Sequence, residues 1–313
     1  MITLIDAVQE AILADPAPLV TDYEVYLHAR RIVQTGGQAG QLVKRLPKAW
    51  DASRTRQLLS RLDARGFLKP DPDFGSGVWR VLQTEQASPA AEAACIADPF
   101  CYVSHYSALE LQGLTVETPE TLQLSRPARP LWNALRDDRV AADVDRREFQ
   151  DAAGLLLRAT PADTLRGRPV VFHETRRPAD FVTLEDGRTR VATVGDTLAA
   201  ALAEPRFFGG MAEALKIWDA HAPANLEVAI AAIDRTEAKI VKVRAGYILT
   251  ERLGLDDSRI DAWRTCAQRG GSRRLDPDAP YRPTFSEAWM ISLNLETNRP
   301  DEAIGALSFG LPG

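Results

Sequence analysis

The chain has few of the features that identify membrane, secreted or disulfide-stabilised proteins. Its 313 residues contain no apolar run near the roughly 18 residues that a membrane helix needs. The first sixteen residues carry Asp6 and Glu10 instead of a basic stretch, so we expect no signal peptide. Three cysteines without a CxxC spacing argue against a disulfide framework. We therefore expect a cytoplasmic protein that has no contact with a membrane.

Signatures of catalysis and of cofactor binding are also missing. The four histidines are scattered and have no metal-ligand spacing. The patterns HExxH, GxSxG, GxGxxG and GxxxxGK[ST] occur nowhere in the chain. We expect no metal, no cofactor and no enzymatic activity.

Charge is distributed unevenly along the chain, whose net charge is −5. Residues 21–80 hold eleven Lys/Arg and six Asp/Glu, a net +5, and residues 26–69 alone reach +8. Residues 1–20 carry −3, which leaves −7 for residues 81–313. A basic segment joined to an acidic remainder is typical of a protein that contacts nucleic acid through one domain.

The pattern of the basic segment predicts a winged helix-turn-helix over residues 1–84. One helix starts at Asp22 and stops at Gly36, a second covers Ala39–Leu46, and a third runs from Ala52 to Gly66. Two short strands around the turn-rich PDPDFGSG then form a hairpin. In such a motif the third helix enters the major groove of DNA and the hairpin lies against the flanking backbone.

The predicted third helix carries the candidate DNA-binding residues. Arg54, Gln57 and Arg61 have i, i+3, i+7 spacing and therefore share one face. Arginine can pair with guanine or phosphate and glutamine with adenine, while hydroxyls at a helix start can reach a phosphate. A protein-contact module with a solvated arginine face remains the alternative. The full predicted set is Lys44, Lys48, Ser53, Arg54, Thr55, Arg56, Gln57, Arg61 and Lys69.

The remainder, residues 85–313, predicts a mixed α/β domain with a helical second half and a further boundary near residue 205. The fold class is therefore α+β. A strand turning into a helix is expected over Phe100–Leu114, and the segment beyond Pro205 has helical periodicity almost throughout. The expected strands are Thr121–Ser125, Leu155–Thr160, Pro169–His173, Phe181–Leu184 and Thr189–Thr193.

Candidate chemistry in this remainder is sparse. Ser104, His105 and Ser107 could form a nucleophile and base, but helix caps and a packed histidine explain them better. Residues 270–272 (Gly-Gly-Ser), followed by Asp276 and Asp278, have the residue types of a metal-dependent nucleotidyltransferase. Their spacing and the interleaved prolines favour a plain loop.

Several blocks together resemble the AbiEi-like antitoxins of type IV (abortive-infection) toxin–antitoxin systems. They occur in the expected order over most of the chain. The blocks are LLSRLDARGFL (58–68), YVSHYSALELQGL (102–114), RVATVGDTLAAAL (190–202), FFGGMAEALKIW (207–218), KVRAGYILTERLG (242–254) and GGSRRLDP (270–277).

The resemblance implies an N-terminal DNA-binding domain that represses its own operon at inverted repeats in double-stranded DNA. It also implies a C-terminal domain that counters a nucleotidyltransferase toxin without forming a stable complex with it. One departure is that Gly195-Asp196 precede Thr197-Leu198 where the family usually has an arginine. Two alternatives stay open: a winged-helix regulator whose C-terminal domain senses a small ligand, and an enzyme targeted to DNA.

Overall fold

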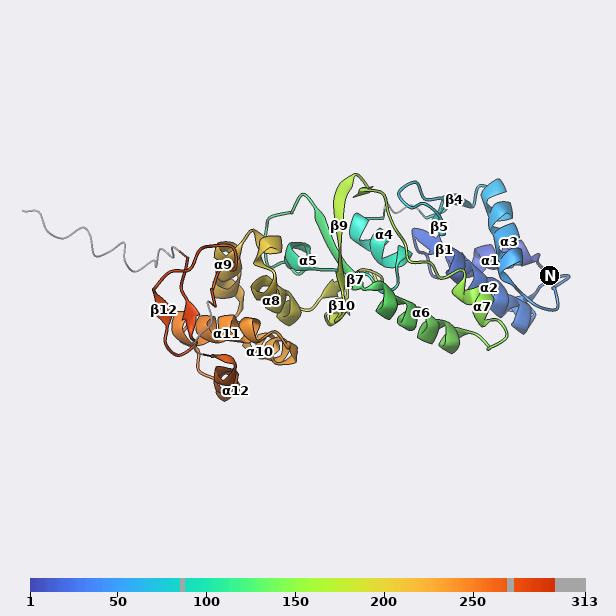
Figure 1. Cartoon of the computed structure of the whole chain (residues 1–313). Coiled ribbons are helices and arrows are strands. Elements are labelled where there is room, and N and C mark those ends of the chain that lie inside the picture. Colours follow the sequence, from blue (N-terminus) through green and yellow to red (C-terminus); the bar gives the residue numbers. More distant parts are fainter. Residues whose placement is uncertain (85–87, 269–272, 296–313) are drawn as a thin grey trace, which may run out of the picture. The chain divides into compact units, whose positions relative to one another are not determined.

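The computed structural model describes residues 1–84, 88–268 and 273–295 (Figure 1). The chain divides into two compact units, Met1–Ala192 and Thr193–Gly313. The fold is mixed α/β with several separate sheets. The observed boundary after Ala192 differs from both predicted boundaries, near residues 84 and 205.

The first part of unit 1 combines three helices with a small sheet. Its elements are α1 (Leu4–Leu13), β1 (Leu19–Thr21), α2 (Asp22–Thr35), α3 (Ala52–Ala64), β4 (Leu68–Pro70) and β5 (Val78–Val81). The strands pair antiparallel in the order β1-β5-β4. Helix α2 begins with a capping box, in which the Thr21 side chain accepts from Glu24 N and Glu24 accepts from Thr21 N.

The predicted helix over Ala39–Leu46 is wrong, because a β-hairpin occupies this position. Strands β2 (Gly37–Gln38) and β3 (Gln41–Leu42) pair antiparallel around a two-residue turn. The turn residues Ala39 and Gly40 have φ of 47° and 77°. Two positive φ angles in succession match the right-handed twist of a tight hairpin, and they are incompatible with a helix.

Helix α1 and strand β1 were not predicted, although both contribute to the core. Thr3 and Asp6 form a capping box at the start of α1, a signal that lies in the sequence itself. Ala7, Val8 and Ala11 are buried against the hydrophobic residues of α2 and α3. Helix α1 is therefore an integral part of the N-terminal fold.

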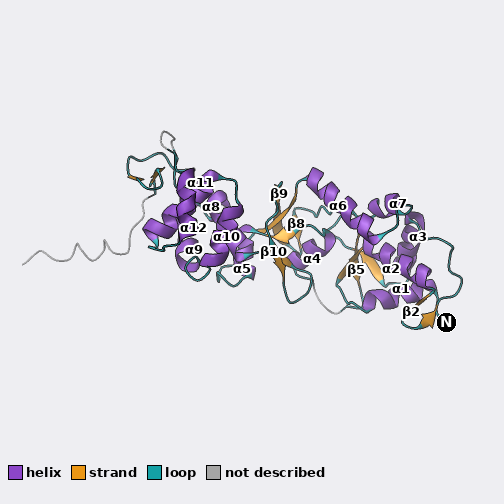
Figure 2. Cartoon of the chain, turned by 90° about the horizontal axis from the view of Figure 1, so that it is seen from below, coloured by secondary structure: helices purple, strands orange, loops and turns teal. Residues whose placement is uncertain are grey.

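The second part of unit 1 is built on a six-stranded mixed sheet, visible in Figure 2 among helices. The strand order is β10-β11-β6-β7-β9-β8, with parallel pairs at β11/β6 and β7/β9. The strands are β6 (Tyr102–Val103), β7 (Leu122–Pro127), β8 (Thr164–Leu165), β9 (Arg168–Thr175), β10 (Phe181–Thr183) and β11 (Arg190–Ala192). The helices are α4 (Ala90–Ala97), α5 (His105–Leu111), α6 (Arg129–Asp143) and α7 (Phe149–Ala153).

Four of the five predicted strands of this region overlap observed strands, but the one over residues 155–160 does not exist. Leu155 and Leu156 are buried in the same core as the N-terminal helices, so their apolar character reflects burial in an irregular segment. Helix α6 was not predicted from the sequence, although Pro130 lies in its first turn, where proline is common.

Contacts between the N-terminal helices and the α6–α7 region explain why no unit boundary follows residue 84. Tyr23 Oη on α2 donates to Asp143 Oδ2 at 2.8 Å. Arg30 Nε donates to Glu148 Oε2 at 2.8 Å, and Val140 lies in the N-terminal core. The predicted DNA-binding domain is therefore continuous with the fold that follows it.

Unit 2 is mainly helical. Its elements are α8 (Val194–Ala203), η1 (Pro205–Phe208), α9 (Met211–His221), α10 (Leu226–Arg235), α11 (Lys239–Tyr247), the π-turn η2 (Ile248–Arg252), α12 (Ser258–Ala262), η3 (Trp263–Cys266), β12 (Phe285–Ser286) and β13 (Ile291–Ser292). Trp218, Ile230 and Trp289 are fully buried within it. In neither unit is a described helix both long and apolar enough to cross a bilayer.

Candidate nucleic-acid interface

Helix α3, the predicted recognition helix, forms as its sequence indicates. Asp51 caps it, and its Oδ1 accepts from Arg54 N at 2.8 Å. Leu58, Leu59 and Leu62 lie on the inward face and join the core of α1 and α2. The opposite face is left to solvent along the whole helix.

Five of the six predicted residues on α3 are exposed, and one is not. Thr55 is 0% exposed; its hydroxyl accepts from Trp50 Nε1 at 2.9 Å and donates to Asp51 O at 3.1 Å. The Thr55 hydroxyl thus already accepts one hydrogen bond and donates another inside the protein. Its predicted contact with a phosphate therefore does not fit the structure. The exposed members are Ser53, Arg54, Arg56, Gln57 and Arg61.

The exposed basic side chains of α3 differ in how much of their charge is already engaged. Arg54 forms an ion pair with Asp51 at the start of the helix. Burial raises the pKa of Asp22, and the positive charge of Arg56 acts against that rise. Arg56 therefore lies close enough to the Asp22 carboxyl group for the two charges to interact. Among the residues described, none forms an ion pair or side-chain hydrogen bond with Arg61. Arg61 is therefore the arginine of α3 most available to a partner.

The segment between the β2–β3 hairpin and α3 adds exposed lysines. Val43 lies beside Ile2, and Lys44 N donates to Ile2 O at 3.0 Å, which ties this segment to the N-terminus. Lys44 and Lys48 are exposed, and the described part of the chain offers no carboxylate within ion-pair distance of either. Lys69 on β4 is also exposed, but its Nζ contacts Asp63 Oδ1 at 2.6 Å.

The loop between β4 and β5 is held against the protein, not extended as a free basic wing. Asp71 is buried and accepts from Arg80 Nε and Arg166 Nη2, each at 2.8 Å. Burial alone would raise the pKa of Asp71, but these guanidinium hydrogen bonds outweigh it and the pKa is lowered. Phe74 is 6% exposed and bridges to Pro161. The loop therefore presents few charges of its own.

The candidate catalytic residues Ser104 and His105 lie in surroundings that fit a structural role. Ser104 Oγ and His105 Nδ1 are 2.9 Å apart, and Ser125 Oγ donates to Ser104 Oγ at 2.8 Å. Both Ser104 and His105 are buried, at 4% and 5% exposure, which favours the packing role over nucleophilic catalysis.

The loop over residues 270–278, which has the residue types of a nucleotidyltransferase, lies only in part within the described residues. Residues 270–272 lie outside the described residues. Asp276 Oδ1 accepts from Asp278 N at 2.8 Å in a local turn. Within the described residues, no three His, Cys, Asp or Glu side chains gather in a way that could hold a metal ion.

The departure from the antitoxin pattern lies at the start of α8. A Cβ atom on Gly195 would come 2.2 Å from Val228 O, so α8 and α10 approach too closely for any side chain there. Asp196 Oδ2 accepts from Arg235 Nη2 at 2.8 Å. This chain thus has a carboxylate paired with an arginine where the antitoxins that its sequence resembles usually have an arginine.

Comparisons with known proteins give a distant structural similarity. No family model and no curated protein matches it. Among solved structures it is similar to the RV2827C protein from Mycobacterium tuberculosis, with 12% sequence identity and a TM-score of 0.46. That similarity covers 92% of this chain and 90% of the other.

Proposed function

We propose that the chain binds double-stranded DNA through α3 and represses its own operon. The observation that carries the proposal is the exposed face of α3, where Gln57 and Arg61 stand one helical turn apart. Lys44 and Lys48 supply further unpaired positive charge near the start of this helix. Such a face matches the chemistry of base edges in the major groove and of the flanking phosphates.

The order of the N-terminal elements supports a winged-helix assignment. Three helices precede a β4–β5 hairpin, and β1 adds to this hairpin as a third strand. One difference from a simple helix-turn-helix is the connection between α2 and α3, which holds the β2–β3 hairpin in place of a short turn. In this proposal α3 reads the major groove and Lys69 contacts the backbone beside it.

Titration of duplex DNA from upstream of the gene tests the proposal. Wild-type protein should bind this DNA more tightly than unrelated DNA, with log K falling against log salt at a slope of about −5 for roughly six phosphate contacts. Gln57→Ala should lower the preference for the specific duplex, while Arg146→Ala, outside the N-terminal block, serves as the control. A flat salt response, or equal affinity for both duplexes, contradicts the proposal.

We propose further that the protein acts as an antitoxin against a nucleotidyltransferase. Support for this part comes only from the ordered sequence blocks that resemble AbiEi-like antitoxins. Expression of the full chain together with the nucleotidyltransferase from the neighbouring reading frame should restore growth that the toxin alone arrests. Arg61→Ala should restore growth equally well, because neutralisation does not require DNA contact. Absence of rescue by the wild-type chain contradicts the antitoxin role.

A further inference from the structure

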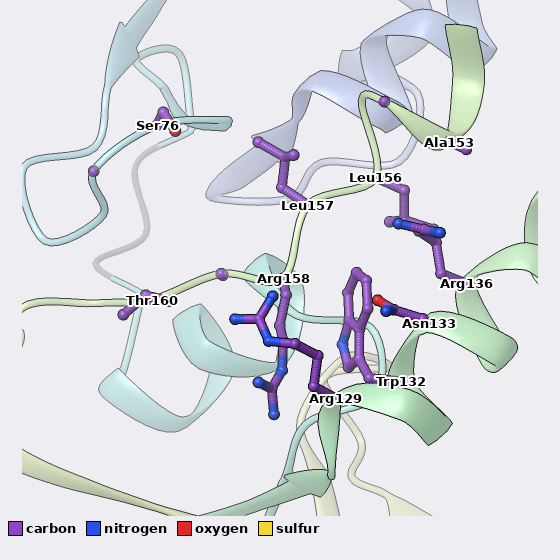
Figure 3. A pocket seen from close by; sticks show the side chains of 13 residues that line it. Ser76, Arg129, Trp132, Asn133, Arg136, Ala153, Leu156, Leu157, Arg158 and Thr160 are labelled. Carbon is purple, nitrogen blue, oxygen red and sulfur yellow. The ribbon is translucent and has the colours of Figure 1, made fainter. Parts of the chain in front are cut away.

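A cavity of about 480 Å³ lies in unit 1, and none of its described lining residues belongs to α3. Three segments that are distant in the sequence line it: the β4–β5 loop at Gly75 and Ser76, the first two turns of α6, and residues 153–160. Figure 3 shows Arg129, Trp132 and Asn133 along α6, with Arg158 on the extended segment that follows α7. A volume of this size accommodates a nucleotide-sized molecule.

Every charged residue that lines the described part of this cavity is an arginine. Arg129 is exposed, and none of the described carboxylates lies within ion-pair distance of it. Arg136 pairs with the adjacent Asp137 at 2.7 Å, and Arg158 pairs with Glu174 at 2.8 Å. The cavity also adjoins the start of α6, where the helix dipole adds positive potential.

Arg158 provides a second observation at the wall of the cavity. Its side chain is only 8% exposed, and its Nη2 donates to Pro127 O at 3.0 Å. Its Nε is buried and has no hydrogen-bond partner among the described atoms. A guanidinium that is shielded from water and lacks one acceptor is costly, so an anion at the cavity wall would stabilise the charge of Arg158.

A second buried arginine, Arg126, lies close enough to Arg158 for the two charges to interact. Burial lowers the pKa of Arg126, and the nearby charge of Arg158 lowers it further. Asp98 offsets part of this charge at 3.8 Å from Arg126 Nη1, but burial raises the pKa of Asp98 as well. Glu174 Oε1 offsets a further part, because it lies 2.8 Å from Arg158 Nη2 and 3.6 Å from Arg126 Nη2. Arg129 is therefore the cavity arginine whose charge no described carboxylate neutralises.

One wall of the cavity is formed by apolar side chains. Trp132 is 2% exposed, its Nε1 donates to Asp98 Oδ1 at 2.9 Å, and its ring meets that of Phe100 edge to face at 5.6 Å. Leu156 and Leu157 complete this side of the cavity. The combination suits a ligand with an apolar or aromatic part beside its anionic groups.

We propose that this cavity binds a small organic phosphate of nucleotide size, with its phosphates on Arg129 and Arg158. Guanidinium groups pair with phosphate oxygens through parallel hydrogen bonds, and the Asn133 amide can donate to a further oxygen. The bound molecule would contact Gly75 and Ser76 of the β4–β5 loop. A regulatory effect of the ligand on DNA binding would rest on the proposed function; the binding site itself does not.

Calorimetric titration of the full chain, without DNA, tests the site with two probes, inorganic pyrophosphate and adenosine triphosphate. We expect both to bind wild-type protein in 150 mM salt, and Arg129→Gln to weaken binding at least tenfold. Arg129 is exposed, so we expect its replacement to leave the fold intact. Arg146→Gln and Arg206→Gln remove the same charge at other exposed positions and should bind both probes within twofold of wild type.

Three results would overturn the proposal. The first is a wild-type protein that binds neither probe below about 1 mM. The second is equal weakening by Arg129→Gln and by either control, which would indicate a diffuse charge effect. The third is loss of duplex DNA affinity in Arg129→Gln with unchanged probe binding, which would make Arg129 a DNA backbone contact. The titrations without DNA are independent of the proposed repressor function, so failure of one does not imply failure of the other.

Discussion

The exposed face around α3 and the internal contacts between distant segments of unit 1 hold basic residues of the same chemistry in opposite surroundings. Arg61, Lys44 and Lys48 are exposed, and no described carboxylate pairs with them. Arg30 and Arg166 instead hold buried or half-buried carboxylates that join distant segments. Net charge along a segment therefore overstates what is available to a ligand, because a part of it is neutralised inside the fold.

The largest expected effect comes from breaking the two ion pairs of the buried Asp71 carboxylate with Arg80 and Arg166. Asp71→Asn removes the charge that Arg80 and Arg166 share, and we expect a loss of about 2–3 kcal/mol in the free energy of unfolding. Urea denaturation measures it. Asp63→Asn, which disrupts only the exposed pair with Lys69, should cost less than about 1 kcal/mol. Equal losses in the two variants would show that exposure does not separate the two groups of charges.

The variants Arg61→Gln and Arg30→Gln distinguish an arginine that binds DNA from one that stabilises the fold. Arg61→Gln should weaken specific DNA binding by about 1–3 kcal/mol and leave stability unchanged. Arg30→Gln should lower stability by about 1–3 kcal/mol, because Glu148 loses its partner, while folded protein keeps its DNA affinity. Fluorescence anisotropy and urea denaturation on both proteins measure the two effects. If both variants changed the same property, the division between the two regions would be wrong.

Thr55→Val tests whether the hydroxyl at the start of α3 acts inside the protein. The variant leaves Trp50 Nε1 without its acceptor, so we expect a loss of about 1–3 kcal/mol in stability and unchanged DNA affinity. Ser53→Ala, at an exposed position on the same turn, should change stability by less than about 0.5 kcal/mol. Reduced DNA affinity of correctly folded Thr55→Val would restore Thr55 to the interface.

The smallest effect is a pH dependence at His28 on α2. Burial lowers the pKa of His28, the charge of Arg31 lowers it further, and Asp15 acts in the opposite direction. The folded protein then binds fewer protons than the unfolded chain, so stability should fall as pH drops from the ordinary value of 6.5 toward the lowered pKa. His28→Gln should flatten the unfolding free energy between pH 7 and 5. An unchanged slope would mean that His28 does not titrate differently in the folded state.

Local signals sufficed to predict α3. The leucines at helical spacing and Gly66 beyond the last turn act over a few residues, and the structure adds Asp51 as the N-cap. The β2–β3 hairpin was missed, since the helical spacing of Leu42, Val43 and Leu46 concealed a turn that Ala39 and Gly40 form through positive φ angles. Local pattern is therefore reliable where propensity and capping agree, and unreliable where two small residues decide the backbone direction.

The sequence by itself determined the uneven charge, helix α3 with its exposed arginines, and most strands of the second sheet. Only the tertiary structure decided which of these charges remain open, because Arg30 and Lys69 meet carboxylates whose positions depend on the fold. It also decided the cavity, since Ser76, Arg129 and Arg158 are separated along the chain and meet only when α6 packs beside the β4–β5 loop. The physical reason is that capping and periodicity act between neighbours in sequence, whereas charge pairing and cavities depend on neighbours in space.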